Sequence, residues 1–276
     1  MISVERLTKT YGEINALDSV TFTVEPGRIC GYLGPNGAGK TTTVRILTGV
    51  LRQTSGRAVV CGFDVGERPL EVKRRIGYVP ETGAIYSTLS SNEFLTLIGT
   101  FHEMPPELLA VRSKQMLEFF DIEKVADHRI DTLSKGMRQK VIITAALLHD
   151  PDVILLDEPL AGLDANAARM IKDILKGLAD RGKTILFCSH MLDVVERLCD
   201  RVIILDEGSI VADGNPKDLM TSEKTDTLEK VFIKLTGMGD YSELAQALIE
   251  TVDSPQRSKD TPRTKSKRSK KKRRGK

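Results

Sequence analysis

The chain has 276 residues, of which 40% are hydrophobic and 29% are charged. This length suits one large domain or two small ones, and the apolar fraction is sufficient for a packed core. No apolar run approaches the roughly 18–20 residues that a membrane-spanning helix needs. The N-terminal stretch MISVERLTKTYG contains no segment typical of a signal peptide. The composition therefore argues against a membrane-spanning or secreted chain, and we expect a cytoplasmic protein.

The net charge of +3 conceals an uneven distribution, because residues 257–276 hold twelve lysines and arginines and a single acid, Asp260. The rest of the chain is therefore mildly acidic. Nothing apolar follows Val252, so we predict a disordered tail. Three interpretations of the tail stay open. It is a solvated segment without a specific partner, it is attracted to an anionic cytoplasmic membrane surface, or it binds nucleic acid. The absence of interleaved aromatic residues disfavours nucleic acid.

The cysteines are widely separated and form no CxxC pair. They are Cys30, Cys61, Cys188 and Cys199. This spacing favours buried thiols in a reducing compartment over a disulfide framework or a metal site.

Residues 1–65 are predicted to be mainly strands, because they are rich in β-branched and apolar residues and are broken by glycine and proline. A turn is expected at 25–27, and Pro80 is expected to stop the last strand. The predicted strands cover residues 2–8, 20–24, 28–34, 55–65 and 75–81, and one helix is predicted over 41–51, ending near Gly49.

From about residue 84 to 149 the apolar spacing becomes three to four, which indicates helices. Strands and helices then alternate, and such alternation favours a largely parallel sheet. Later elements are a hairpin at 203–214, a helix capped by Asn215 with Pro216 at its first position, a helix at 227–236 and a short helix at 241–251.

The segment GPNGAGKT, residues 34–41, fits the pattern G-x-x-x-x-G-K-[ST] at every fixed position. An apolar strand precedes it and a helix follows it. The glycines allow backbone N–H groups to turn towards phosphates, and the helix N-terminus adds positive potential. Lys40 can reach the β- and γ-phosphates, and the Thr41 hydroxyl can ligate Mg²⁺. The segment therefore predicts a nucleotide-binding loop.

Two further groups stand where predicted buried strands end. Asp157 and Glu158 follow an apolar strand, and consecutive side chains point in different directions. Asp157 can therefore serve the Mg²⁺ shell while Glu158 polarises an attacking water. His190 ends the next strand and could reach the γ-phosphate or that water, although a lone histidine at a strand end is more often a surface residue.

The segment LSKGM, residues 133–137, allows two interpretations. Ser134 is suited to cap the helix that follows. The same helix N-terminus is also suited to hold a phosphate group.

The order of these motifs resembles the ATP-binding cassette (ABC) ATPases. GPNGAGKTT (34–42) is similar to the family's Walker A motif, and VILLDEP (153–159) to its Walker B motif with the catalytic glutamate. LAGLD (160–164) is similar to the D-loop, and SH (189–190) to the switch histidine. Tyr11 stands where the family places an aromatic residue that stacks on adenine.

The resemblance implies an α/β fold, with a P-loop NTPase core, an N-terminal antiparallel β subdomain and an inserted α-helical subdomain. The implied domains are an ABC ATPase domain over 1–220 with its helical subdomain at about 84–150, a C-terminal helical extension over 221–252 and a disordered basic tail over 253–276.

The resemblance also implies ATP and Mg²⁺ as ligands. Glu158, His190 and Glu81 are the expected catalytic residues, and Thr41, Asp157 and Glu81 the expected metal-binding residues. The expected nucleotide contacts are Tyr11, Gly34, Pro35, Asn36, Gly37, Ala38, Gly39, Lys40, Thr41, Thr42, Ser134, Gly136 and Asp164.

Two positions depart from the family pattern. Glu81 stands where the family mostly has glutamine, and its added charge would alter Mg²⁺ affinity or coupling. Lys135 replaces the first glycine of the usual signature Leu-Ser-Gly-Gly-Gln. It either strengthens an ATP-bound dimer by its charge or points to solvent.

A single set of motifs implies two such chains arranged head to tail, with Ser134 and Gly136 of one chain facing ATP on the other. The resemblance further implies a separate membrane permease that docks near 84–150, and hence a cytoplasmic subunit peripheral to the inner or plasma membrane. LEKVFIKLTG, residues 228–237, is similar to a segment of bacterial drug, polysaccharide and antibiotic exporters. The alternative function is a non-transport ABC ATPase with a regulatory, ribosome-linked or nucleic-acid-linked role.

Overall fold

The computed structural model describes residues 1–81, 86–237, 246, 248, 249 and 251. Residues 1–238 and 239–276 form separate units. In the second unit, the described residues Gln246, Leu248, Ile249 and Thr251 are helical. Within the described residues, no helix has both the length and the apolar character needed to cross a bilayer.

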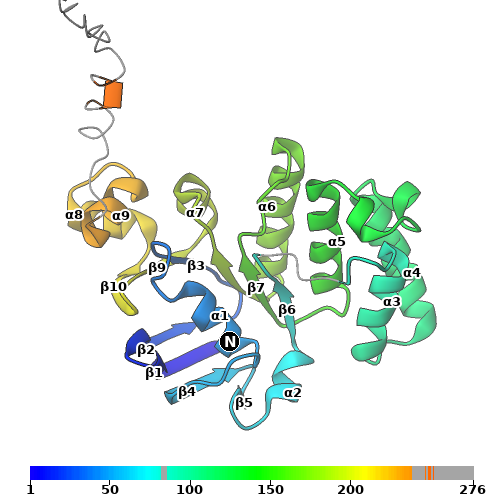
Figure 1. Ribbon diagram of the computed structural model, residues 1–276, viewed down its shortest axis with the longest axis horizontal. Coiled ribbons are helices and arrows are strands. Elements are labelled where there is room, and N and C mark those ends of the chain that lie inside the picture. The colour runs from blue at the N-terminus through cyan, green and yellow to red at the C-terminus, as the bar shows by residue number, and fades with distance from the viewer. Residues whose placement is uncertain (82–85, 238–245, 247, 250, 252–276) are drawn as a thin grey trace, which may run out of the picture. The chain divides into compact units, whose positions relative to one another are not determined.

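The first unit contains two sheets (Figure 1). One is antiparallel, has the order β2-β1-β4-β5 and consists of β1 (Ile2–Tyr11), β2 (Ile14–Val24), β4 (Ser55–Val60) and β5 (Phe63–Asp64). The other has the order β10-β9-β3-β8-β7-β6 and consists of β3 (Ile29–Leu33), β6 (Ile76–Val79), β7 (Val153–Asp157), β8 (Thr184–Cys188), β9 (Arg201–Asp206) and β10 (Ser209–Gly214). Its pairs are parallel except β9 with β10.

Helices cover both faces of the second sheet. Helix α1 lies between the two sheets, while α5, α6 and α7 lie on the opposite face, and α3 and α4 stand beyond α5 (Figure 1). The helices are α1 (Lys40–Leu47), α2 (Pro69–Lys73), α3 (Ser91–Phe101), α4 (Pro106–Phe119), α5 (Lys135–Leu147), α6 (Ala165–Asp180), α7 (Leu192–Leu198), α8 (Pro216–Glu223) and α9 (Leu228–Thr236), with short 3₁₀ turns at Glu123–Val125 and Ile130–Thr132.

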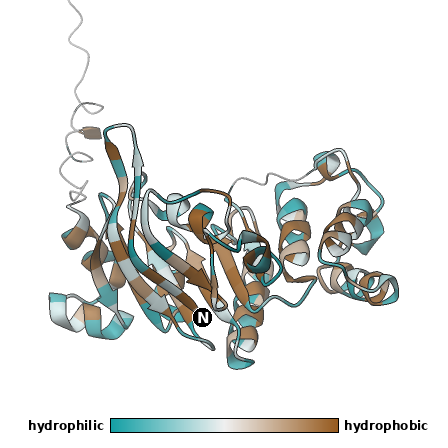
Figure 2. Ribbon diagram, turned by 90° about the horizontal axis from the view of Figure 1, so that it is seen from below, coloured by the Kyte–Doolittle hydropathy of each residue, from teal (hydrophilic) through white to brown (hydrophobic). Residues whose placement is uncertain are grey.

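The strands of the parallel sheet are buried on both faces, and alternate residues enter different cores. In β7, Ile154 and Leu156 pack with the helices of the outer face, whereas Val153 and Leu155 pack towards α1 and the antiparallel sheet. This period of two follows from the pleat of a strand. Hydrophobic residues accordingly follow the central strands, while the helices carry both hydrophobic and hydrophilic residues (Figure 2). The double burial fixes the register of β7 and hence the place where its terminal acids emerge.

The α/β class with a largely parallel sheet, an antiparallel β sheet and an inserted group of helices is confirmed. The hairpin at 203–214 and the cap by Asn215, whose Oδ1 accepts from Lys217 N at 2.9 Å, are confirmed as well. The predictions for the short helix at 241–251, apart from its four described residues, and for the tail at 253–276 lie outside the described residues.

Two predicted strand boundaries were wrong, whereas helix α1 ends at Leu47, with Thr48 as its C-cap, and so ends near Gly49 as predicted. Strand β2 begins at Ile14 rather than at residue 20. The strand predicted over 55–65 is divided into β4 and β5, because Cys61 and Gly62 take positive φ values of 52° and 80° and turn the chain. Helix α2 was not predicted.

The predicted burial is confirmed for Cys30, Cys188 and Cys199, whereas Cys61 is only partly buried, and all four thiols are free. Burial raises the pKa of Cys30 to about 12, so this thiol stays protonated and unreactive at neutral pH. The described residues contain no cluster of histidine, cysteine and acidic residues suited to a metal ion.

Candidate nucleotide-binding site

The loop at residues 34–41 joins β3 to α1 and needs glycine for its shape. Gly37 and Gly39 take φ values of 88° and 107°, a region that side chains disfavour. A Cβ built on Gly39 would lie 2.5 Å from Ala16 O and 2.6 Å from Leu17 Cδ2. The loop therefore rests directly on strand β2, and only a glycine fits at this contact.

Lys40 lies across this loop. Its Nζ donates to Gly34 O at 2.6 Å and to Pro35 O at 3.0 Å. Lys40 is also the first residue of helix α1, so its charge adds to the positive helix N-terminus. A cavity of about 360 Å³ opens here, and it is lined by Asn36, Gly37, Gly39, Lys40, Thr41, Thr42, Glu81, Asp157 and Glu158. Its cation and backbone amides suit a phosphate chain.

Asp157 ends β7 and is 2% exposed. Burial, together with the charges of Glu81 and Glu158, raises the pKa of Asp157 to about 6 from an ordinary value of 3.8. Lys40 and the Thr41 hydroxyl, which donates to Asp157 Oδ2 at 3.4 Å, offset part of this effect. The protein's own side chains therefore compensate the charge of this carboxylate only in part.

Glu158 follows in an unfavourable backbone conformation. Its φ of 51° is uncommon for a residue with a side chain and costs about 1–3 kcal/mol. Its amide donates to Cys188 O at 3.0 Å, which ties the turn to the end of β8. The side chain of Glu158 is 13% exposed. The strained turn directs this carboxylate to one side of the chain while Asp157 stays in the sheet.

His190 and Ser189 hold the carboxylate of Glu158 from the end of β8. His190 Nδ1 lies 2.8 Å from Glu158 Oε2, and the hydroxyl of Ser189 donates to the same oxygen at 3.4 Å. The imidazole is 78% exposed, so its far nitrogen is accessible from the site. This arrangement allows Glu158 to accept a proton while His190 contacts a bound group.

The structure brings together the phosphate loop, both acids of β7, Glu81 and His190. A second cavity of about 520 Å³ joins Lys40 and Glu158 to His190 and is also lined by Phe232 of helix α9. Glu81 is exposed and lines both cavities. The predicted convergence of these strand ends is thus confirmed as geometry.

Other predicted nucleotide contacts lie apart from these cavities. Tyr11 ends β1, is 47% exposed and has Lys9 Nζ 5.0 Å from its ring centroid. Ser134 caps α5 by accepting from Met137 N at 3.2 Å, which confirms the cap interpretation. Asp164 caps α6 by accepting from Ala167 N at 2.9 Å, and this hydrogen bond lowers the pKa of Asp164. Gly136 lies in the first turn of α5 and faces the loop that contains Gly162.

Sequence reasoning missed two contributors to the site. Ser189 was noted only as part of the SH pair, although its position at the strand end would have suggested a hydrogen-bond donor. Phe232 offers no such signal, since it is one apolar residue of an amphipathic helix far along the chain.

A third cavity, of about 500 Å³, opens between the nucleotide site and the inserted helices. Thr41, Glu81 and Asp157 lie at one end of its lining. The other residues that line it include Val50, Lys73, Phe94, Ile98, His102 and His149, which belong to or adjoin α1, α2, α3 and α5. We call this cavity the cleft.

A phosphate loop, a buried aspartate and a glutamate in contact with a histidine, together at the carboxyl edge of a parallel sheet, define a P-loop nucleoside triphosphatase. The family model described as "ABC transporter" matches residues 17–161. The Nod factor export ATP-binding protein I of Ralstonia nicotianae is 38% identical over 223 residues, which cover 81% of this chain and 70% of that protein. The linearmycin resistance ATP-binding protein LnrL of Bacillus subtilis is 34% identical over 239 residues, covering 87% of this chain and 76% of the relative.

Solved structures agree with this assignment. An ATP-binding subunit of an ABC transporter matches with a TM-score of 0.81 and 30% identity, covering 86% of this chain and 99% of that one. A dimeric ATP-binding cassette in a post-hydrolysis state, bound to ADP and Pi, matches with a TM-score of 0.73 and 28% identity, covering 78% and 98%. The chain belongs to the ABC transporter family, as an ATP-binding subunit with ATPase activity.

Proposed function

We propose that the chain hydrolyses Mg²⁺-bound ATP at the site built on β3, β7 and β8, and that it drives export through a separate membrane permease. The observation that carries the site is the convergence of Lys40, Thr41, Asp157, Glu158 and His190 around adjoining cavities. Each residue type there matches one requirement of phosphoryl transfer to water.

The residues have distinct roles. Lys40 and the loop amides neutralise the β- and γ-phosphates and keep them in place. Glu158 accepts the proton of the attacking water, which is activated without a free hydroxide. His190 orients Glu158 through their 2.8 Å contact and presents its other nitrogen to the γ-phosphate. Tyr11 would stack on adenine.

The donor set fits Mg²⁺. The Thr41 hydroxyl, Asp157 and Glu81 offer the oxygen ligands that this ion prefers, and the raised pKa of Asp157 shows a buried carboxylate short of positive charge. When bound, Mg²⁺ would neutralise charge on the phosphate oxygens. Asp157 and the Thr41 hydroxyl, which are 3.4 Å apart, would hold the ion together with exposed Glu81.

Two copies of the chain would share the ATP sites. Ser134 and Gly136 stand at the exposed N-terminus of α5, whose first turn contains no acidic residue, and they lie apart from the phosphate loop of their own chain. Such a helix end attracts an anion. In a head-to-tail arrangement, the γ-phosphate of ATP on a second copy would be the anion bound at this helix end. Asp164 would lie at the same interface.

The cleft is the proposed docking place of the permease. It extends from Thr41 and Asp157 to the inserted helices, so a partner seated there would sense the nucleotide site. Val50, which lines the cleft, is 68% exposed, and Phe101, next to the lining residue His102, is 65% exposed. Exposed large apolar side chains around a cavity suit a protein partner.

Export is proposed from two relatives, one named for Nod factor export and one for linearmycin resistance. The subunit would then lie on the cytoplasmic face of the membrane. The basic tail would add attraction to anionic lipids, at about 1 kcal/mol for each lysine or arginine near the surface.

The glutamate-to-glutamine variant tests the nucleotide mechanism. Glu158→Gln should reduce hydrolysis by about 10²-fold or more while ATP still binds, because the proton acceptor is removed and the binding groups remain. With Mg²⁺-ATP the variant should elute as a dimer on size-exclusion chromatography. Glu118→Gln, on the surface of α4, is the matched control. Turnover of Glu158→Gln at the wild-type rate would remove Glu158 from its role.

Two further experiments test the partners. Membrane proteins that co-purify with the full chain from solubilised membranes should be lost with Val50→Glu or Phe101→Glu. They should be retained with Phe119→Glu, which changes an exposed residue of α4 outside the cleft lining.

Liposomes with anionic lipid should retain the full chain better than a chain ending at residue 252, and this difference should vanish in high salt. Equal binding of the two chains would exclude the membrane role of the tail.

A further inference from the structure

Lys135 is the first residue of helix α5, and its side chain crosses the glycine of a neighbouring loop. Gly162 takes a φ of 80°, and a Cβ built on it would lie 2.8 Å from Cδ and 2.9 Å from Cγ of Lys135. The aliphatic stem therefore covers Gly162 in van der Waals contact. Lys135 thus packs onto its own chain.

Two more residues of the same helix face meet this loop. A Cβ on Gly136 would lie 2.9 Å from Gly162 O, so the helix and loop backbones approach closely. Buried Gln139 donates from Nε2 to Pro159 O at 2.9 Å. Positions separated by three or four residues share one face of a helix. The first turn of α5 therefore rests on residues 159–162.

This loop starts directly after Glu158. Ala161 N donates to Glu158 O at 3.2 Å, and Leu163 N donates to Leu160 O at 3.2 Å. The aim of Glu158 depends on its φ of 51°, which persists only where the surroundings impose it. Groups that hold residues 159–162 therefore also hold the carboxylate of Glu158 towards His190.

The charge of Lys135 does not account for its position. Among the described residues, its ammonium has no ion-pair partner, and the first turn of α5 offers no acid. A cation at a helix N-terminus is itself unfavourable. The stem, in contrast, has a defined contact on Gly162.

We propose that Lys135 is a positioning residue for hydrolysis in its own chain, and that its aliphatic stem fixes the loop at 159–162 and thereby the aim of Glu158. The inference rests on the role proposed above for Glu158. It connects the helix end that would face a second copy's ATP to the proton acceptor of the same chain. A change at one ATP site would then reach the other through this contact.

Two variants separate the stem from the charge. Lys135→Met keeps a long apolar side chain and removes the charge, whereas Lys135→Ala removes both. Lys114→Ala, on the surface of α4, is the control for loss of an exposed lysine. With Lys135→Ala we expect kcat to fall about 3- to 10-fold with unchanged ATP affinity, because a small misplacement of a catalytic group affects the chemical step. Lys135→Met and Lys114→Ala should stay close to wild type.

Hydrogen exchange of the nucleotide-free chain supplies a readout that does not depend on catalysis. The amides of Ala161 and Leu163 should exchange about 10-fold faster in Lys135→Ala than in wild type, and at the wild-type rate in Lys135→Met. Equal losses in both variants would show that the charge matters and would overturn the proposal. Unchanged exchange, or faster exchange with unchanged kcat, would overturn it too. If Glu158→Gln kept full turnover, the proposed function would fail while the exchange result still stood.

Discussion

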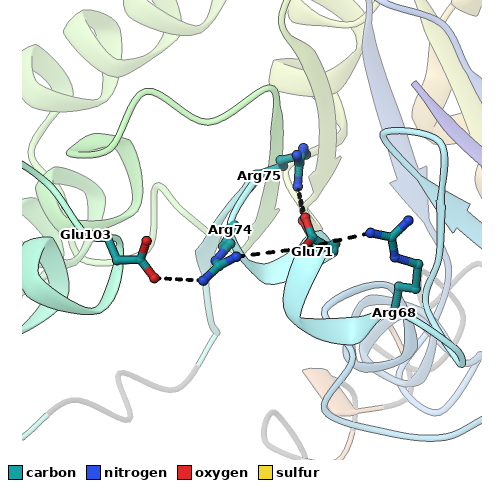
Figure 3. Close-up of polar contacts among 5 residues, drawn as sticks. All are labelled: Arg68, Glu71, Arg74, Arg75 and Glu103. Carbon is teal, nitrogen blue, oxygen red and sulfur yellow. Dashed lines mark hydrogen bonds and ion pairs between the residues drawn. The ribbon is translucent and has the colours of Figure 1, made fainter.

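Charged side chains gather in two regions of this molecule under opposite conditions. At the carboxyl edge of the parallel sheet, buried Asp157 lies near two other carboxylates, Glu81 and Glu158, with Lys40 as the cation that offsets them. Around α2, exposed and partly buried side chains alternate in sign (Figure 3). Glu71 lies 2.7 Å from Arg75 and 3.8 Å from both Arg68 and Arg74, and Arg74 pairs with Glu103 at 2.7 Å.

The difference separates charges that serve a ligand from charges that serve the fold. At the sheet edge, Lys40 and Thr41 compensate Asp157 only in part, so this carboxylate destabilises the ligand-free protein and favours a bound cation. The pairs around α2 are compensated and at least partly open to water, where an exposed pair contributes less than about 1 kcal/mol. They contribute by fixing the position of α2. Arg68 and Arg75 also lie 4.6 Å and 4.3 Å from the ring centroid of Phe63, which holds α2 against β5.

Removing the cation of the sheet-edge region should have the largest effect. Lys40→Ala should weaken ATP binding by about 10²-fold, because it deletes the charge that offsets the phosphates and the three acids. Isothermal titration calorimetry measures this change, and Lys176→Ala on the exposed face of α6 is the control. Unchanged affinity would remove Lys40 from the phosphate site.

Neutralising Asp157 should stabilise the ligand-free protein while it impairs hydrolysis. The folded-state pKa of about 6 exceeds the ordinary 3.8, so the folded protein binds this proton more tightly than the unfolded chain does. The carboxylate therefore destabilises the fold fully above pH 6 and not at all below about pH 4. Asp157→Asn should raise the free energy of unfolding by about 1–3 kcal/mol at pH 7.

Urea denaturation in EDTA at several pH values checks this prediction. The gain from Asp157→Asn should shrink as the pH falls from 6 to 4. Asp152→Asn, an exposed neighbour in the chain, should show no such gain. A gain that did not depend on pH would point to packing instead of charge.

His149, in the wall of the cleft, should change the folding stability in the opposite direction to Asp157 over the same pH range. Burial and the nearby His102 lower the pKa of His149 to about 4, and Lys183 adds to this effect, while the hydrogen bond with Ile76 and the charge of Asp150 act against it. The two imidazoles stack with centroids 3.5 Å apart, and His149 Nε2 donates to Ile76 O at 3.0 Å. Because the folded-state pKa lies below the ordinary 6.5, His149 contributes stability above pH 6.5 that is lost as the pH falls towards 4.

His149→Gln keeps a donor for Ile76 O and removes the titration. Relative to this variant, wild type should lose about 1–2 kcal/mol of unfolding free energy between pH 6.5 and 4. In the Asp157→Asn background, where the opposing effect is absent, the loss of stability on acidification should become visible directly. His128→Gln is the control, and equal pH profiles of wild type and His149→Gln would contradict the prediction.

The parts of the fold and site that could be predicted from the sequence are those set by local patterns. The loop at 34–41 and the acids at 157–158 were predictable, because each is a local pattern attached to a strand that is buried on both faces. Helix α2 was missed, since five residues are too short to show a helical period. The contacts of Lys135 with Gly162 and of Gln139 with Pro159 depend on how distant segments pack, and no local pattern encodes them.

Removing one surface ion pair should have the smallest effect on the free energy of unfolding. Glu103→Gln deletes the 2.7 Å ion pair with Arg74, in which the Glu103 and Arg74 side chains are 73% and 54% exposed. Because solvent screens this pair, the free energy of unfolding should fall by less than about 0.5 kcal/mol, and the change should vanish at high salt. The pair still joins α2 to the end of α3, so hydrogen exchange should quicken at the last turn of α3 even where global stability is unchanged. Glu107→Gln on α4 is the control. A loss of unfolding free energy above about 1 kcal/mol that persisted in high salt would show that solvent does not screen this pair.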